Sequence, residues 1–369
     1  MNSSGNKNLN FADKDYVKAY AHHSIPLSIA LYDDRNLPWL YEHFIQIFSF
    51  DYNTIFHIDY TEQVKQYREI LEIIQIPHYK TSTITDIVPF LINSINNDLF
   101  ITVFVDEFYL ENRYASNRLH YLRQIAVNGY DTNTKLFHCK GFGRYTDNSF
   151  SDSGYDHYRA EDIPFETLAR AYGEGYGRYE GPADQYIILW GRKKDSSGHE
   201  FNVHSFLSRL NQYITSSGYM QSQTAIGHNV LKLLEESVYW MIYERRQTVD
   251  SRAFYTIYEH SKLLLDSLKF VSRLINPPSA IFDQLLTEYA SLIVPKSQKL
   301  FYQFLHFEYK ARIKGYIVDQ KFTPFDDASI ERRSQVKDLE NLIVSIQNFK
   351  TLDMTVTTNL FHELAHRFN

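Results

Sequence analysis

The pattern of hydrophobic and polar positions changes near residue 200 of the 369-residue chain. Before Glu200, short runs of β-branched and aromatic residues alternate with amphipathic stretches and turn residues. After it, glycine becomes rare, and long stretches with apolar residues three or four positions apart follow one another, which is typical of packed helices. The sequence therefore predicts an α+β protein, with an α/β domain over 15–195 and an all-helical domain over 200–369.

The most regular part of the first half is a predicted strand followed by a β-hairpin. Leu99–Val105 is an unbroken apolar run, which is typical of a strand covered on both faces. Tyr121–Tyr130 and Lys135–Lys140 are two further strand candidates, and the segment 131–134 between them has the residues of a tight turn. These segments predict an antiparallel sheet.

The other predicted elements follow from periodicity and from turn residues. A helix is predicted over 26–48, with Ser24 or Ile25 as its cap and Pro38 as a kink or break. In the first half we also predict helices at 61–74, 86–97 and 164–172 and strands at 53–59 and 186–190. In the second half the predicted helices span 202–215, 224–247, 251–275, 279–292, 296–315, 329–348 and 356–367.

Composition narrows the classes of protein. The formal net charge is −6, and basic residues occur only in short clusters such as Arg192-Lys193-Lys194 and Arg245-Arg246, so the chain lacks the basic stripe that nucleic acid requires. A single cysteine excludes an internal disulfide, and the polar N-terminus has no apolar signal segment. No run reaches the about 18 apolar residues of a membrane span. We expect a cytoplasmic protein without a cofactor.

Several motifs of the first half resemble the N-terminal family of butirosin biosynthesis protein H. The motifs are an acidic pair after the central strand, Asp106-Glu107, then Asn112-Arg113, a strand that ends in Gly129-Tyr130-Asp131, and a partner strand that ends in Gly141-Phe142. Upstream, His43-Phe44-Ile45-Gln46-Ile47 belongs to the same pattern. The resemblance covers residues 15 to 195.

The resemblance implies a papain-like fold and transfer of an acyl group from a carrier protein to an amine in natural-product biosynthesis. Such transfer requires a cysteine thiolate at a helix N-terminus, a histidine on the hairpin strand and an Asp or Asn that orients the histidine. This chain departs from that pattern. Cys139 lies in the second hairpin strand, and Arg123-Gln124 occupies the place of the histidine.

Substitute catalytic residues are Ser24, His120 and Asp106. Ser24 follows His22 and His23 near the start of the first predicted helix, where the family has its cysteine, and its alternative role is a helix N-cap. His120 lies at the entry of the hairpin strand, and its alternative role is a partly exposed polar contact. Asp106 and Glu107 would face a cleft or be ordinary solvated loop residues.

A second motif lies at the end of the chain, where residues 362–366 read HELAH and match H-E-x-x-H. On a helix, His362 and His366 share a face and would bind zinc with Glu363 as general base, as in a metalloprotease. A third ligand would have to come from upstream, with Glu259 and His260 as candidates. The alternative is a terminal amphipathic helix without metal, and this is our prediction.

The glycine cluster over 173–177 is compatible with a phosphate-binding loop only if a strand precedes it and a helix follows. Here the predicted order is reversed, so we expect a loop that borders a cleft.

Two classes of function remain. The first is an active acyltransferase or amidase that uses Ser24 and His120. The second, which we favour, is a non-catalytic or atypical relative that binds an acyl or peptidyl carrier protein, or its acylated intermediate. A carrier protein is typically acidic, so Arg192-Lys193-Lys194 or Arg245-Arg246 would form the docking patch.

Overall fold

The computed structural model describes residues 5–52, 55–77, 84, 86–143, 157–178, 186–193, 197–217, 224–243, 248–276, 278–313, 317–318, 321–322 and 330–368. The chain divides into two compact units. The α/β unit comprises Met1–Leu37 and Gln63–His199, and the helical unit comprises Pro38–Glu62 and Glu200–Asn369. The division near residue 200 lies where the periodicity changes, but our α/β domain also included 38–62, which the structure groups with the helices.

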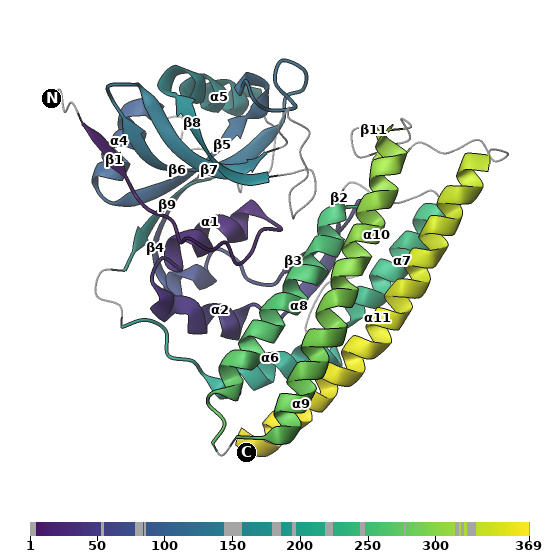
Figure 1. Cartoon of the computed structure of the whole chain (residues 1–369). Coiled ribbons are helices and arrows are strands. Elements are labelled where there is room, and N and C mark those ends of the chain that lie inside the picture. The colour runs from purple at the N-terminus through teal and green to yellow at the C-terminus, as the bar shows by residue number, and fades with distance from the viewer. Residues whose placement is uncertain are drawn as a thin grey trace. The chain divides into compact units, whose positions relative to one another are not determined.

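A large antiparallel sheet forms the centre of the α/β unit (Figure 1). Its strand order is β4-β9-β5-β6-β7-β8, and β1 pairs with β6. The strands are β1 (Asn6–Asn8), β4 (Leu71–Pro77), β5 (Leu99–Asp106), β6 (Leu122–Asp131), β7 (Leu136–Gly143), β8 (His157–Pro164) and β9 (Tyr186–Arg192). The predicted α+β class with an antiparallel sheet is therefore confirmed.

The hairpin β6–β7 is closed as its turn residues predict. Asp131 accepts hydrogen bonds from the backbone N–H groups of Asn133 and Thr134, which is the Asx-turn geometry. Gly129, two residues before Asp131 in β6, lies beside the paired strand β1. A Cβ at this position would be 2.8 Å from the carbonyl oxygen of Lys7. A side chain at this position would push β1 away from the sheet.

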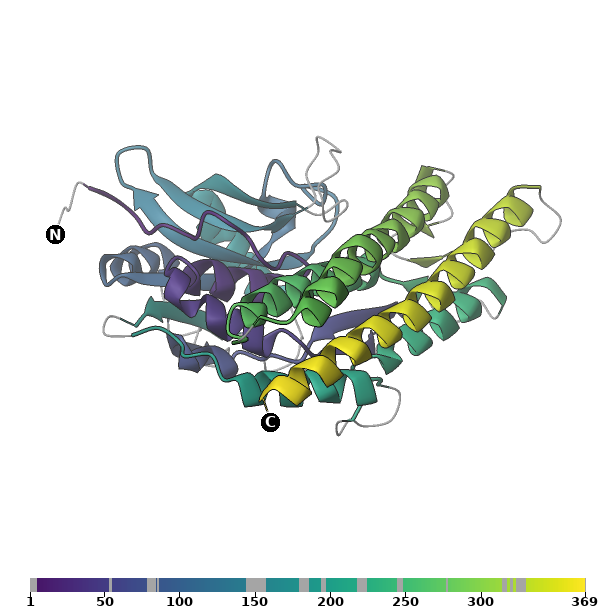
Figure 2. The same cartoon turned by 60° about the horizontal axis from the view of Figure 1, so that its bottom comes forward.

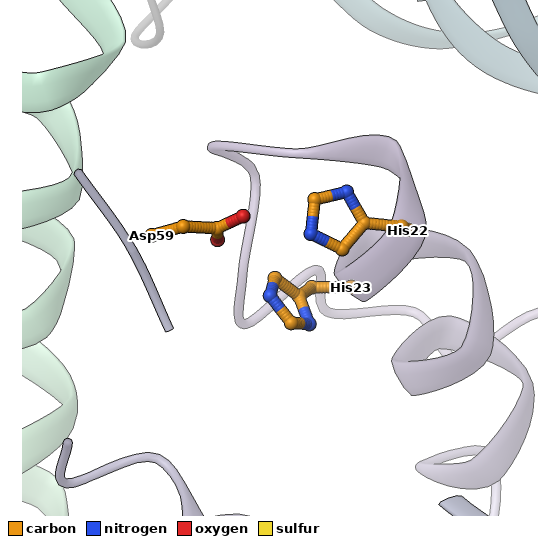
Figure 3. Close-up of side chains that lie close together, drawn as sticks. All are labelled: His22, His23 and Asp59. Carbon is orange, nitrogen blue, oxygen red and sulfur yellow. The ribbon is translucent and has the colours of Figure 1, made fainter. Parts of the chain in front are cut away.

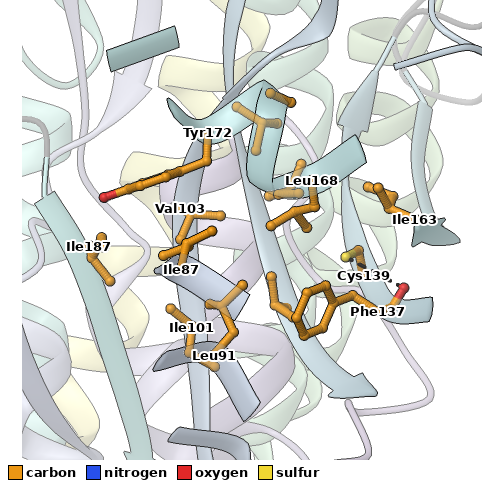
Figure 4. Packing of buried hydrophobic residues seen from close by; sticks show 14 of the residues in the cluster. Ile87, Leu91, Ile101, Val103, Phe137, Cys139, Ile163, Leu168, Tyr172 and Ile187 are labelled. Carbon is orange, nitrogen blue, oxygen red and sulfur yellow. Dashed lines mark hydrogen bonds between the residues drawn. The ribbon is translucent and has the colours of Figure 1, made fainter. Parts of the chain in front are cut away.

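The core of this unit lies between the sheet and two helices, α4 (Ile87–Asn96) and α5 (Phe165–Arg178) (Figure 4). Ile101, Val103 and Val105 of β5 belong to this cluster, whereas Phe100 and Thr102, at the alternate positions, are buried outside it. Since successive side chains of a strand point to opposite faces, β5 is buried on both. This confirms the prediction for the central strand.

Two predicted helices of the first half are wrong. Instead of one helix over 26–48, the chain forms α1 (Ala21–Ala30), η1 (Asp34–Asn36), α2 (Leu37–His43) and then the strand β2 (Ile47–Tyr52). Pro38 lies in the first turn of α2, where its missing N–H costs no hydrogen bond. Instead of a helix over 61–74, the chain forms η2 (Gln66–Glu69) and β4, which pairs along its full length with β9.

The helical unit contains long helices packed along one another (Figures 1 and 2). They are α6 (Val203–Thr215), α7 (Asn229–Tyr243), α8 (Ser251–Ser272), α9 (Ala280–Glu288), the π-turn η4 (Tyr289–Ile293), α10 (Val294–Ile313) and α11 (Ile330–Phe368). The last is one helix of 39 residues where we predicted two. The described strands of this unit are β2, β3 (Ile55–Tyr60) and three two-residue strands, β10 (Thr248–Val249), β11 (Ile317–Val318) and β12 (Lys321–Phe322).

In the part of 200–369 that the structure describes, the regular elements are thus helices and those three short strands. None of the helices in the described part of the chain is both long and apolar enough to cross a membrane.

Candidate functional site

Two of the three predicted catalytic residues lie together at the end of β5. Asp106 is buried, and its Oδ2 lies 2.6 Å from Nδ1 of His120. The other carboxylate oxygen, Oδ1, accepts hydrogen bonds from the backbone N–H groups of Phe108 and Tyr121. Because the carboxylate is held at both oxygens, it fixes the position of the imidazole.

The imidazole of His120 is itself half-exposed, with 41% of its side chain accessible. Its ring stacks on Phe108 at 4.3 Å between centroids, so the ring plane is fixed as well as the Nδ1 contact. A carboxylate on Nδ1 favours the tautomer in which Nε2 accepts a proton. The pair has the arrangement of the base and its orienting acid in a catalytic triad.

Ser24, the third predicted catalytic residue, does not join this pair. It is buried, and its hydroxyl donates a hydrogen bond of 2.7 Å to the carbonyl of Tyr20, one turn earlier in α1. It is not the N-cap either, because α1 begins at Ala21 with Tyr20 as its cap residue. The predicted N-cap role of Ser24 is therefore wrong, and its catalytic role stays a prediction that the contact with Tyr20 does not support. A hydroxyl without a base beside it is hardly ionised near neutral pH.

The two histidines before Ser24 lie in the first turn of α1 (Figure 3). Their ring centroids are 4.2 Å apart. His23 is fully buried, and its Nδ1 lies 2.9 Å from the hydroxyl of Tyr67, within the same unit. These contacts give His23 a packing role in the α/β unit.

Cys139 is a core residue rather than a nucleophile. It lies in β7, is 1% exposed and packs among apolar side chains of the main cluster, as Figure 4 shows. Burial raises the pKa of its thiol well above the usual range, and the carboxylates of Glu161 and Asp162 act in the same direction. A thiolate does not form under these conditions.

A buried cluster of charged residues lies next to the Asp106–His120 pair, and the sequence did not reveal it. Nε of Arg123 lies 3.3 Å from Oε1 of Glu107. Nη1 of Arg113 lies 3.4 Å from the same oxygen, and Nη2 of Arg113 pairs with Glu161. We call Glu107, Arg113, Arg123 and Glu161 the Arg–Glu cluster.

The cluster depends on a glycine. Nη1 of Arg113 donates to the carbonyl of Phe142 at 2.9 Å, and a Cβ at Gly143 would overlap the guanidinium group. Both Arg113 and Glu107 are almost fully buried. A buried arginine that stands 48 positions from its partner Glu161 leaves no periodic signal in the sequence, so only the folded chain reveals the pair.

The HELAH segment forms part of α11, with His362 and His366 both exposed. Oε1 of Glu363 accepts hydrogen bonds from the hydroxyl of Ser279 at 2.7 Å and from Nε of Arg367 at 3.0 Å, and these bonds lower the pKa of its carboxyl. Glu363 therefore ties α11 to the start of α9, a structural role that we did not predict.

The proposed third zinc ligands are engaged in other contacts. Glu259 accepts a hydrogen bond from the hydroxyl of Tyr60, and Nε2 of His260 lies 2.8 Å from the carbonyl of Ile45. Taken one at a time, the described parts of the two units hold no group of three His, Cys, Asp or Glu side chains close enough to share a metal ion.

The remaining predicted sites are the glycine cluster and the two basic clusters. Residues 173–177, predicted as a loop, are the end of α5. Arg192 and Lys193 are described, and both donate hydrogen bonds to backbone carbonyls within the α/β unit. Lys194, Arg245 and Arg246 lie outside the described residues.

The site at the end of β5 can therefore accept and donate protons through His120, but neither Ser24 nor Cys139 supplies it with a nucleophile. Comparison with known proteins adds no assignment: no family model and no curated protein matches this chain.

Proposed function

We propose that the chain is a non-catalytic relative of the papain-like acyltransferases of the butirosin H type and that it binds an acylated carrier protein in a natural-product pathway. One observation carries this proposal. Arg123 stands where those enzymes have their histidine, and its guanidinium is committed to Glu107 in the Arg–Glu cluster. An arginine stays protonated at every physiological pH, so it cannot act as the general base.

The position of Ser24 supports the same conclusion. Acyl transfer through a covalent intermediate needs a nucleophile and a base within hydrogen-bond reach of one another. The hydroxyl of Ser24 is directed to the carbonyl of Tyr20, and the imidazole of His120 is held by Asp106. A papain-like scaffold with these two features binds an acyl carrier without transferring its cargo.

A docking surface for the carrier protein is the loop that precedes β6, residues 111–121. This loop exposes Tyr114, Leu119 and Tyr121. The guanidinium groups of Arg118 and Arg123 lie over the rings of Tyr114 and Tyr121, at 5.6 and 4.9 Å from their centroids. Aromatic and apolar side chains accompanied by arginine are typical of protein interfaces, and the positive charge of the exposed Arg118 suits an acidic partner.

A second candidate function follows from the hydrogen bond between Asp106 and His120. If the pair is catalytic, His120 takes a proton from the water or acceptor amine that attacks the carbonyl carbon of a bound thioester, and Asp106 stabilises the imidazolium. The C–S bond then breaks, and the imidazolium returns the proton to the departing thiolate of the carrier. This is an acyltransferase or thioesterase activity without a covalent enzyme intermediate. It differs from the first proposal in its dependence on His120.

One experiment separates the two candidates. A carrier protein loaded with a short acyl thioester is titrated with the chain by calorimetry at 50 and 300 mM salt, and acyl loss to added amines is followed by mass spectrometry. We expect binding that weakens about tenfold at the higher salt, because a charge-dependent interface is screened. We expect acyl loss no faster than in the chain-free control.

Two variants make the result specific. Arg118→Glu should weaken binding further, whereas Lys299→Glu, an exposed charge reversal in the helical unit, should not. Binding that ignores both salt and Arg118→Glu would reject the docking surface. Rapid acyl transfer that His120→Ala abolishes would show that the protein is an enzyme and overturn the first proposal.

A further inference from the structure

A hollow of about 320 Å³ lies in the α/β unit, and neither Asp106 nor His120 lines it. Its walls come from three places: the segment 30–36 after α1, residues Ile70 and Leu71 at the start of β4, and Arg192 and Lys193 at the end of β9. The volume is at the lower limit for small-molecule pockets, which are about 300–1,000 Å³. The hollow therefore suits a small ligand.

Two residues of the lining, Arg192 and Lys193, offer positive charge. The half-buried guanidinium of Arg192 is fixed by donation from Nε to the carbonyl of Ile29 and from Nη2 to the carbonyl of Asn10. It lies over the ring of Tyr32, 4.0 Å from the centroid. Among the described residues none accepts a hydrogen bond from Nη1 or forms an ion pair with this guanidinium, and burial lowers its pKa. Together with Lys193 it suits a carboxylate.

The lining also offers acceptors. Asn36 is 6% exposed, and its Nδ2 donates to the carbonyl of Ala30 at 2.9 Å. That bond fixes the amide orientation, because the reverse orientation would bring two oxygens together. Within the described chain, Oδ1 of Asn36 is buried and has no hydrogen-bond donor. A buried acceptor without a donor costs about 1–3 kcal/mol, and a ligand N–H would remove that cost.

Asp34, an exposed residue, also lines the hollow and can supply a carboxylate. Its neighbour Asp33 is already paired with Arg35 through two nitrogens. The remaining wall consists of Ala30, Ile70 and Leu71, which are apolar and buried. The lining thus combines cationic groups, a buried acceptor, a carboxylate and apolar side chains.

We propose that this hollow binds a small apolar α-amino acid. Its carboxylate pairs with Arg192 and Lys193, its ammonium donates to Oδ1 of Asn36 and to Asp34, and its side chain packs on Ile70 and Leu71. This site is independent of carrier-protein binding, so either proposal can fail without the other.

The test uses L-valine and L-leucine as probes with the full chain, and binding is followed by calorimetry and by ligand-observed saturation-transfer NMR. Leucinamide lacks the carboxylate, and N-acetyl-leucine lacks the ammonium. We expect saturable binding of the free amino acids and at least tenfold weaker binding of both derivatives. Absence of saturable binding, or equal binding of a derivative, would overturn the proposal.

Variants of the exposed rim locate the site without disturbing the core. Lys193→Gln and Asp34→Asn should each weaken leucine binding several-fold, while Glu111→Gln, an exposed acid outside the hollow, should leave it unchanged. Circular dichroism checks that all three variants fold. Leucine binding that both rim variants leave unchanged would place the ligand elsewhere and refute the assignment.

Discussion

Replacement of Arg113 by methionine tests whether the Arg–Glu cluster holds the end of β5 in place. The side chain of Arg113 is 1% exposed, that of Glu107 is 3% exposed and that of Glu161 is 16% exposed. Methionine fills much of the volume but removes the only group through which Arg113 neutralises the two carboxylates. The variant therefore leaves buried negative charge with less compensation.

The expected cost follows from that burial. Removal of one partner of a buried ion pair typically costs about 3–5 kcal/mol, since the remaining charge stays desolvated. The hydrogen bond from Nη1 to the carbonyl of Phe142 is lost as well. With a urea dependence of about 2 kcal/mol per molar, the unfolding midpoint should fall by about 1.5–2.5 M.

Gly143→Ala provides an independent way to break the same contact. A Cβ at residue 143 would overlap the guanidinium of Arg113, so the arginine must leave its place. The two substitutions should therefore be strongly non-additive: Gly143→Ala in the Arg113→Met background should cost less than about 1 kcal/mol. The control is Arg118→Met, an exposed arginine of the same loop, for which a change within about 0.5 kcal/mol is expected.

The assay must report on the α/β unit alone, because the two units can unfold separately. Hydrogen exchange under increasing urea, read by mass spectrometry in peptides from β5 to β7, meets this need. A loss below about 1 kcal/mol for Arg113→Met, or additive effects of the two substitutions, would refute the reasoning. The Arg–Glu cluster would then be a set of tolerated charges rather than a stabilising contact.

Three further predictions concern titration, the cysteine and metal. Burial lowers the pKa of His228 and of His260 below the reference value of 6.5. As the pH falls below 6.5, the unfolded chain therefore binds protons before the folded chain does, and the urea midpoint of the helical unit should decrease. Each histidine contributes at most about 1.4 kcal/mol per pH unit. An unchanged midpoint at pH 5.5 would contradict this prediction. Cys139 in the native chain should react with a thiol reagent at least about 100-fold more slowly than in urea, and fast labelling of the native chain would contradict its assignment as a core residue. Cys139→Ser should cost about 1–3 kcal/mol of stability, because its hydroxyl enters the apolar core. Purified protein should hold less than about 0.1 equivalents of zinc by mass spectrometry, and a full equivalent removed by His362→Ala would restore the metalloprotease hypothesis.

The strands and helices with strong periodicity were predictable from the sequence. The β5 strand and the β6–β7 hairpin were found because apolar runs and an Asx-turn segment agree there. The β4 strand was missed for a physical reason. It lies at the edge of the sheet, and in 71–77 only Leu71 and Ile73 are buried, while Ile74 is 54% exposed. Because the exposed Ile74 is also apolar, the apolar positions Ile70, Leu71, Ile73 and Ile74 fit a helical spacing of three and four residues, and the alternation of buried positions is hidden.

The candidate site was predictable only in part. An acid at the end of a buried strand and a histidine at the entry of the next one are close in any hairpin-like sheet, so Asp106 and His120 could be paired in advance. Ser24 could not be excluded, because the sequence does not show whether a helical hydroxyl turns back to the carbonyl four residues earlier. The ion pairs of Arg113 join segments far apart in the chain and have no local signature.

Asp106 and Glu107 show how neighbouring acids acquire different roles from the same strand end. Asp106 accepts bonds from two backbone N–H groups and from an imidazole that remains half-exposed, so its charge acts on a group that solvent and ligands can reach. Glu107 lies between two guanidinium groups inside the unit, where its charge is neutralised and unavailable to a ligand. The same strand end thus supplies one acid to a structural contact with two arginines and the other to a contact with a histidine. The geometry at this strand end is therefore compatible with our proposal of a binding site at His120 in which Arg123 does not act as a base.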